Sequence, residues 1–371
     1  MSAQHAQTVQ SAQPSLAQPS QQRLGSRLRA YLEFVAAVVY FFAARSVARH
    51  SAAGLVNSDW SPLVAQAMLV FLLLIGFAGF GILFDHQKNS IGEQGLPIRE
   101  GLAKEAGMGL AVGWGLAVAC ALLLALLGGI AIVLNPQPAA WGWLLADAAF
   151  FTLAALAEEI AFRGYAFQRL VRAVGPLGAS LGFAALYAAV EAYRPGSSHA
   201  SVAVSVVFSL LLSLAYLRTR ALWVSWGINF GWKASRALLF GLVVSGVSSH
   251  SPVIEGDPMG SFWATGGGYG LDASWIAFAL LLLAIPLVYR LTRELDFRYN
   301  APVIVAGGIP VDLDAAARRQ HEQAMGPETP APAPLVQIGP ALPAGVPGES
   351  GPKPSGSGPS GSVPPSPGPS A

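Results

Sequence analysis

The sequence predicts an all-α polytopic membrane protein, in which about eight transmembrane helices enclose an intramembrane cavity and both tails are disordered. Hydrophobic residues make up 53% of the 371 residues, whereas charged residues make up only 11%. An ordinary soluble chain carries about 25% charged residues, because polar side chains must cover its surface. The mean hydropathy of +0.50 points the same way. A formal net charge of +2 excludes a strongly basic nucleic-acid-binding protein, so we expect the lipid bilayer as a partner and no nucleic acid.

The two ends of the chain differ in composition from its middle. Residues 1–22 are rich in Gln, Ser and Ala, which predicts a disordered cytoplasmic leader. The transmembrane helical domain is predicted over 23–298 and a juxtamembrane segment with a short helix over 299–325. Residues 326–371 are almost all Pro, Gly, Ser and Ala, which is typical of a disordered tail, and nothing in them identifies a partner. The single cysteine, Cys120, excludes a disulfide framework and a cysteine-based zinc site.

Eight apolar segments between the tails approach the length of about 20 residues that a bilayer crossing needs. They lie at about 31–47, 62–84, 108–134, 141–167, 177–193, 201–217, 222–246 and 273–290. Lys and Arg accumulate on the cytoplasmic side of membrane proteins. Most basic residues here precede the first segment or follow the even-numbered ones, which predicts an inner-membrane protein with both termini cytoplasmic. Only Arg45 and Arg49 lie on the wrong side under this prediction.

Two adjacent acids, Glu158 and Glu159, interrupt the fourth apolar segment. A carboxylate in hydrocarbon is costly, so intramembrane acids are functional-site candidates. Neighbouring helical residues point about 100° apart, so both acids cannot face one pocket. Glu159 and Arg163 are four residues apart in the favourable acid-first order, and we assign them to a structural ion pair that leaves Glu158 facing the cavity. By position alone, a purely structural acid cluster near the helix end is an equal alternative.

Further polar residues are predicted to meet Glu158 at one depth. The Gly-Pro pair at 175–176 is a turn signal, and Glu158 and Glu191 lie nearly symmetrically about it. Two antiparallel helices would then place both acids about 24 Å from the turn, at 1.5 Å per residue. Asn229 and Lys233 lie one turn apart on one face of the seventh segment, at a similar depth. Two acids, an amide and an ammonium are therefore expected to converge on one cavity.

The arrangement Glu158-Glu159-x-x-x-Arg163, followed by a glycine, resembles the first motif of a known family. This is the CAAX prenyl endopeptidase and bacteriocin-processing (CPBP) family of intramembrane metalloproteases. Residues 222–233 are similar to its third motif, which usually consists of His, three spacers and Asn. Glu191 falls where the family has Phe, three spacers and His. The Gly-rich stretch before the last apolar segment is similar to that of many bacterial members, so the resemblance covers a core of about 145–290.

The resemblance implies a fold, an activity and roles for individual residues. Family members cleave prenylated or leader-bearing membrane peptides, and their first-motif Glu is thought to activate a water as general base at a catalytic zinc. Carried over, Glu158 matches the base, and Glu159 and Arg163 match its partners. The two His and the Asn of the later motifs are replaced in this sequence by Glu191, Asn229 and Lys233, respectively. A register shifted to place Tyr187 at the first His position restores no imidazole either.

These replacements disfavour zinc. Zinc prefers His, Cys and carboxylate ligands, whereas an amide oxygen is a poor ligand and an ammonium is none. Glu158 and Glu191 are possible ligands, but a Lys233 ammonium beside them would repel a divalent ion. Our hypothesis is that Lys233 replaces the metal electrostatically. His199, at the start of the sixth segment, and His250, in the loop after the seventh segment, are the other ligands considered, although a His at a span end is more often interfacial.

Three functions are compatible with this sequence. The first is a CAAX-type intramembrane endopeptidase with a degenerate metal site, acting on a membrane-anchored peptide. The alternative is a catalytically inactive relative that serves as a membrane binding or scaffolding module, so whether the chain is an enzyme stays open. The third, a small-solute transporter or channel, is less favoured because the sequence contains no internal repeat or pair of broken helices. No cofactor is predicted with certainty, since zinc is only the expectation from the family.

Overall fold

The computed structural model describes residues 18–86, 90–134, 137–246 and 253–299. The chain divides into two units, Met1–Pro302 and Val303–Ala371, and all described residues belong to the first. The predicted tail at 326–371, nearly all of the juxtamembrane segment at 299–325, and most of the leader at 1–22 lie outside the described residues.

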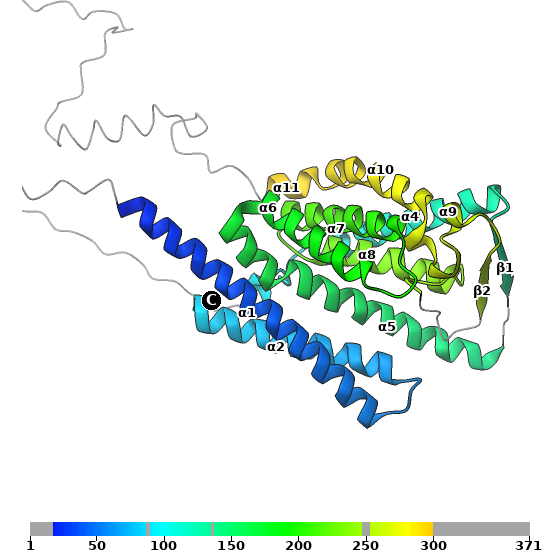
Figure 1. Ribbon diagram of the computed structural model, residues 1–371, viewed down its shortest axis with the longest axis horizontal. Coiled ribbons are helices and arrows are strands. Elements are labelled where there is room, and N and C mark those ends of the chain that lie inside the picture. Colours follow the sequence, from blue (N-terminus) through cyan, green and yellow to red (C-terminus); the bar gives the residue numbers. More distant parts are fainter. Residues whose placement is uncertain (1–17, 87–89, 135–136, 247–252, 300–371) are drawn as a thin grey trace, which may run out of the picture. The chain divides into compact units, whose positions relative to one another are not determined.

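Long helices make up most of the described structure (Figure 1). They are α1 Gln18–Leu55, α2 Ser61–Asp85, α4 Leu102–Leu126, α5 Pro138–Arg163, α6 Tyr165–Ala192, α7 His199–Thr219, α8 Trp223–Ala234 and α10 Trp275–Leu291. The shorter helices are α3 Ser90–Glu93, α9 Phe262–Thr265 and α11 Arg293–Tyr299. A π-helical turn, Ser235–Leu239, continues α8. Two 3-10 turns, Gly267–Tyr269 and Leu271–Ala273, precede α10.

The predicted number of eight membrane spans is not confirmed. Among the described residues, five helical stretches are long and apolar enough to cross a membrane, or six if a pair of helices bent by 52° counts as one span. The five are Leu24–Leu55, Ser61–Asp85, Leu102–Leu126, Ala140–Ala192 and His199–Thr219, and the bent pair is Trp275–Leu291 with Arg293–Tyr299. Two predicted spans, 141–167 and 177–193, fall within the single 53-residue stretch. These helices nevertheless make the chain a helical membrane protein.

The predicted span at 222–246 is absent as a continuous helix. Helix α8 contains 12 residues and the π-helical turn that continues it contains 5. At 1.5 Å per residue they span at most about 26 Å, which is short of a hydrocarbon core of about 30 Å. After the π-helical turn the chain bends at Gly241, which has a φ of 62°. A Cβ atom there would lie 2.1 Å from the carbonyl oxygen of Ile254, so this approach of two backbones requires glycine.

A two-stranded sheet departs from the all-α prediction. The apolar segment predicted at 108–134 is helical only to Leu126, and Gly128, with a φ of 66°, follows the helix end. Strand β1, Ile130–Leu134, then pairs antiparallel with β2, Ile254–Pro258. Isoleucine and valine dominate β1, and such β-branched residues favour strands over helices. Hydropathy alone does not separate this strand from the helix before it.

Close packing against α4 places α8 in the interior. A Cβ atom on Gly109 would lie 2.2 Å from the Val224 oxygen, and one on Gly227 would lie 2.4 Å from the Ala106 oxygen. Glycines on both helices therefore allow their backbones to approach, as is common in membrane proteins. Helix α5 contacts both α2 and α8, and α1 contacts α2 and α6 (Figure 1). Asn229 on α8 is consequently fully buried.

Four charged residues of α1, α2 and α6 form a group that we call the Arg169 network: Glu33, Asp85, Arg169 and Arg172. Nη1 of Arg169 donates to Oδ1 of Asp85 at 2.7 Å and to Oε2 of Glu33 at 3.3 Å. Arg172 also donates to Asp85, at 3.1 Å. The Arg169 side chain is only 1% exposed. The network therefore ties three helices together through compensated charges.

Candidate functional site

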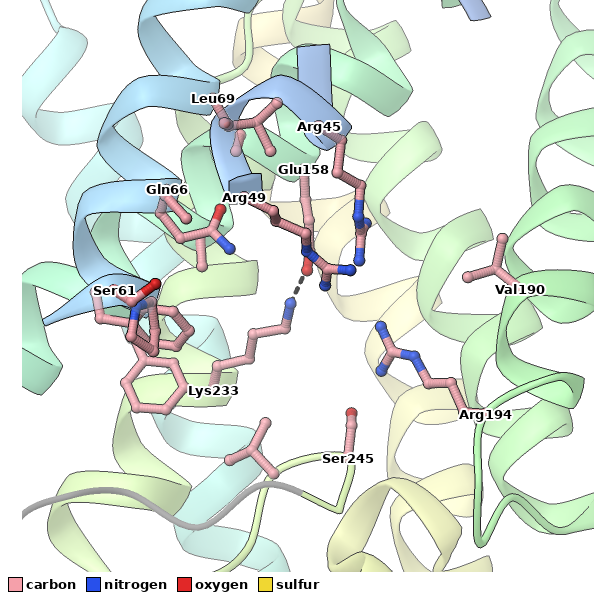
Figure 2. Close-up of a pocket in the computed structure, with 18 of the residues that line it drawn as sticks. Arg45, Arg49, Ser61, Gln66, Leu69, Glu158, Val190, Arg194, Lys233 and Ser245 are labelled. Carbon is pink, nitrogen blue, oxygen red and sulfur yellow. Dashed lines mark hydrogen bonds and ion pairs between the residues drawn. The ribbon is translucent and has the colours of Figure 1, made fainter. Parts of the chain in front are cut away.

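A cavity of about 1280 Å³ lies among the helices, and Figure 2 shows many of the side chains that line it. Its walls come from α1, α2, α5 and α6, from Lys233 near the end of α8, and from the irregular segment at 244–246. Apolar side chains such as Phe41, Phe150 and Phe151 form much of the lining. This cavity, which we call the chamber, has charged residues on an apolar wall.

Glu158 is the centre of the polar contacts in this cavity. Its Oε2 accepts hydrogen bonds from Nζ of Lys233 at 2.5 Å, from Nδ2 of Asn229 at 3.1 Å and from the hydroxyl of Tyr187 at 3.3 Å. Figure 2 shows Lys233 extending to Glu158 across the chamber. The Glu158 side chain is 26% exposed and that of Lys233 is 13% exposed. Hydrogen bonds to an ionised group are strong, so these three donors stabilise the carboxylate in its apolar surroundings.

Glu159 faces away from the chamber. Its Oε1 lies 3.3 Å from Nη1 of Arg163, and both side chains are completely buried. Arg163 also donates through Nη2 to the backbone oxygen and the hydroxyl of Ser209, both at 3.2 Å. The expected ion pair is thus present. Asn229 joins the two acids, because its Nδ2 donates to Oε1 of Glu159 at 2.9 Å as well as to Glu158.

Glu191 lines the same chamber but has different partners. Its Oε1 accepts a 2.5 Å hydrogen bond from the Tyr269 hydroxyl, and its Oε2 lies 3.5 Å from Nη1 of Arg194. Burial and the hydrogen bond to the Glu191 carboxylate raise the pKa of Tyr269, so this hydroxyl keeps its proton and acts as donor. The structure therefore joins Glu158, Asn229 and Lys233 directly and leaves Glu191 on the chamber wall. Its tyrosine partner belongs to the Gly-rich stretch before α10.

The residues around Glu158 do not fit a zinc ion. Nowhere in the described ranges do three His, Cys, Asp or Glu side chains lie close enough together to hold a metal. Oε2 of Glu158 is in contact with an ammonium, which is no ligand. His199 is exposed at the first residue of α7 and is not part of the chamber lining. His250 lies outside the described residues.

A second buried charge pair fixes the chain segment next to Lys233. Oδ1 of Asp272 accepts from Nη1 of Arg236 at 2.7 Å, and its Oδ2 accepts from the Ser245 hydroxyl at 2.7 Å. Burial alone would raise the pKa of the Asp272 carboxyl, but the Arg236 guanidinium and the Ser245 hydroxyl hold the pKa below its ordinary value. The pair attaches the irregular segment after α8 to the loop before α10. Sequence analysis missed it, although Arg236 lies one helical turn beyond Lys233.

Two arginines of α1, Arg45 and Arg49, also line the chamber. In the sequence they are only exceptions to the charge rule that predicts orientation. Figure 2 shows their guanidinium groups pointing into the space that Glu158, Lys233 and Arg194 also face. Sequence analysis could have detected a role for them, because charged residues within an apolar segment are candidates for a functional site.

Comparison with known proteins identifies the segment that contains Glu158 and Lys233. Residues 138–235 match the model of one protein family, described as type II CAAX prenyl endopeptidase Rce1-like. No curated protein and no solved structure matches the chain. The matched segment contains α5, α6, α7 and α8, and with them Glu158, Glu159, Arg163, Glu191, Asn229 and Lys233. Its apolar helices and this match agree with a membrane protein of the predicted kind. Residues 138–235 are thus similar to the Rce1-like CAAX prenyl endopeptidases.

Proposed function

We propose that this chain is an Rce1-like membrane protein whose chamber binds membrane-anchored peptides without zinc-dependent cleavage. The observation that carries the proposal is the 2.5 Å contact between Nζ of Lys233 and Oε2 of Glu158. Glu158 matches the family's general base, and here its Oε2 holds an ammonium. Lys233 thus supplies the positive charge that a buried carboxylate needs.

The chemistry of the replaced positions supports this proposal. A zinc peptidase needs several ligands, an open coordination position and a carboxylate within reach of the metal-bound water. Asn229 is fully buried and directs its amide nitrogen at both neighbouring acids, so the nitrogen acts as donor and not as ligand. Glu191 is engaged by Tyr269 and Arg194. Glu191, Asn229 and Lys233, which replace the His and Asn residues of the family's motifs, therefore all form hydrogen bonds or ion pairs with neighbouring side chains.

Peptide binding is supported by the size and lining of the chamber. A volume of about 1280 Å³ exceeds the roughly 300–1,000 Å³ of typical small-molecule pockets. Its apolar wall suits the side chains or the lipid anchor of a membrane-bound peptide, which would come from the bilayer. In the same proposal, the protein resides in the inner membrane with both termini cytoplasmic.

A second function is metal-independent hydrolysis by the Glu158–Lys233 pair. It is favoured by one observation, the contact of both side chains with the chamber, together with the hydroxyl of Tyr187 on the same carboxylate. A buried lysine that has given up its proton is able to act as a base.

One experiment distinguishes these functions. The natural protein and the variant Glu191→His/Asn229→His/Lys233→Asn are purified in detergent, and zinc content, peptide binding and peptide cleavage are measured with a prenylated membrane-anchored peptide. We expect the natural protein to bind the peptide without cleaving it, and the triple variant to gain zinc. Cleavage by the natural protein that a chelator abolishes would contradict the proposal.

The control addresses the second function. Cleavage that resists a chelator and disappears in Lys233→Met, but not in Lys104→Met, would favour the metal-independent reaction. Lys104 is an exposed lysine at the start of α4 and does not line the chamber, so its variant matches the chemical change without touching the site. Natural protein that fails to bind the peptide at all would refute peptide binding as such.

A further inference from the structure

Two arginines line the chamber without a hydrogen-bond or ion-pair partner among the residues that the structure describes. Arg45 is half-buried and Arg49 is exposed, and neither forms a hydrogen bond or an ion pair with any residue that the structure describes. The charges that act on Arg45 are those of Arg49, Glu158 and Arg194, two of which are positive. The two arginines therefore add positive charge to the chamber.

The acids of the chamber wall already have partners. Glu158 is paired with Lys233, and Glu191 is paired with Arg194. Asp147, the third acid of the described lining, is buried and also has a partner. No acid of the described lining is thus left over for Arg45 or Arg49.

The position of the two arginines is unfavourable unless something binds there. They lie four residues apart on α1, and like charges at this spacing destabilise a helix. The same helix is otherwise apolar enough to cross a membrane, where an arginine is costly. Figure 2 shows both guanidinium groups directed into the chamber together with that of Arg194. An anion in this space would compensate them.

The surroundings indicate what kind of anion fits. Apolar residues of the lining, Phe41, Leu69 and Val190, lie in the same chamber as the arginines. Val190 is 38% exposed and Tyr193, also in the lining, is 90% exposed, so the chamber reaches the outer surface along α6. In a membrane protein such an apolar surface faces lipid. The ligand should therefore carry an anionic group on an apolar body.

We propose that Arg45 and Arg49 bind the phosphate of an anionic phospholipid whose acyl chains follow the apolar wall of the chamber. Guanidinium groups hold phosphate oxygens with paired, charge-assisted hydrogen bonds. The site lies on α1, outside the segment that matches the family, and its existence does not depend on whether the chamber binds or cleaves peptides.

The test measures lipid binding to the purified full-length chain by native mass spectrometry. Phosphatidylglycerol, phosphatidylcholine and inorganic phosphate are titrated separately. The variants are Arg45→Gln/Arg49→Gln, the charge-retaining Arg45→Lys/Arg49→Lys, and the control Arg290→Gln/Arg293→Gln. The control removes two positive charges from exposed arginines of α10 and α11 that do not line the chamber. Thermal unfolding of each variant verifies that it is folded.

We expect the natural protein to bind phosphatidylglycerol more tightly than phosphatidylcholine. The glutamine variant should bind it at least about tenfold more weakly, because charge-assisted hydrogen bonds are lost. The lysine variant should retain part of the affinity, and the control variant all of it.

Several results would overturn the proposal. One is equal affinity of the glutamine variant and the natural protein for phosphatidylglycerol, and another is equal affinity of the natural protein for the two lipids. Inorganic phosphate that displaces the lipid at equal concentration would make free phosphate the ligand. A peptide with a free C-terminal carboxylate that binds more tightly, and is lost in the same variant, would assign the arginines to a peptide instead.

Discussion

The Arg169 network and the chamber bury charge in opposite ways. In the network, Arg169 meets two acids, and the exposed fractions of Arg169, Glu33 and Asp85 are 1%, 8% and 16%. In the chamber, paired charges lie beside two arginines that have no partner among the described residues, and a volume of about 1280 Å³ is open between them. Glu33 and Arg45 are both on α1, only about 18 Å apart at 1.5 Å per residue. Charges that are paired with each other in a closely packed region indicate a structural role. Positive charges without a partner beside a cavity indicate a ligand site.

The largest expected effect is in the network. Arg169→Gln removes the buried cation that Glu33 and Asp85 share and leaves each of them only one partner at the surface, Arg29 and Arg172 respectively. Breaking a buried ion pair costs about 3–5 kcal/mol. We expect a loss of this size in the free energy of unfolding, measured in detergent micelles. Arg172→Gln is the control, since that side chain is 53% exposed and its loss should cost far less. Equal losses in the two variants would remove the distinction between the regions.

The second effect concerns coupling between Glu158 and Lys233. Groups in direct contact show interaction energies of about 0.5–3 kcal/mol in double-mutant cycles. We expect coupling in this range from the unfolding of Glu158→Gln, Lys233→Met and the double variant. The double variant should be more stable than Lys233→Met alone, because that single change leaves a carboxylate without its cation. Additive effects would mean that the contact contributes nothing to stability.

The third effect is confined to acid pH. The pKa of Asp272 is lowered in the folded state, so its charged form stabilises the protein above the unfolded-state value of 3.8. This stability is lost as the pH falls through the folded-state pKa, below about 3.8. The stability difference between the natural protein and Asp272→Asn should therefore shrink in this window. Unfolding temperatures measured against pH test it, with Asp257→Asn, at an exposed aspartate of β2, as a control that shows no such change.

The smallest effect on stability is expected at the unpartnered arginines. Arg45→Gln and Arg49→Gln should each change the free energy of unfolding by no more than about 0.5 kcal/mol, because neither side chain loses a partner among the described residues. A slight gain is possible, because like charges one turn apart repel each other. The measurement requires delipidated protein, since a bound lipid would add its own stabilisation. A loss as large as that of Arg169→Gln would show that these arginines are structural.

The directions of the Glu158 and Glu159 side chains could be predicted from the sequence, because helix geometry alone constrains them. Adjacent acids must face different sides, and Glu159 must reach Arg163 one turn away. The contact of Glu158 with Lys233 followed from comparing depths in the two segments. The partners of Glu191 did not follow, because Tyr269 lies in a loop region with no periodic pattern. Arg45 and Arg49 conflict with the rule that Lys and Arg accumulate on the cytoplasmic side, so the sequence marks them as unusual. It does not predict that they line the chamber.

The fold was predictable in class but not in detail. Hydropathy measures the length of an apolar run, so it does not detect the backbone approach at Gly241 that ends the helix after α8. Hydropathy also does not distinguish β1 from the helix before it, since isoleucine and valine occur in both membrane helices and strands. The Gly-Pro pair at 175–176 was expected to reverse the chain, and the contacts around it confirm this. Gly175 has a φ of 85° within α6, and the ring centroids of Phe167 and Phe183, eight residues to either side of it, lie 5.5 Å apart.

The zinc content of the natural full-length protein tests most directly whether Lys233 has taken the place of the metal. The protein is purified without chelators, supplied with zinc, and analysed for metal per chain by elemental analysis. This account predicts far less than one zinc per chain, unchanged by Glu158→Gln. Stoichiometric zinc that is lost in Glu158→Gln and in Glu191→Gln would contradict it, because a metal would then lie where the ammonium is placed.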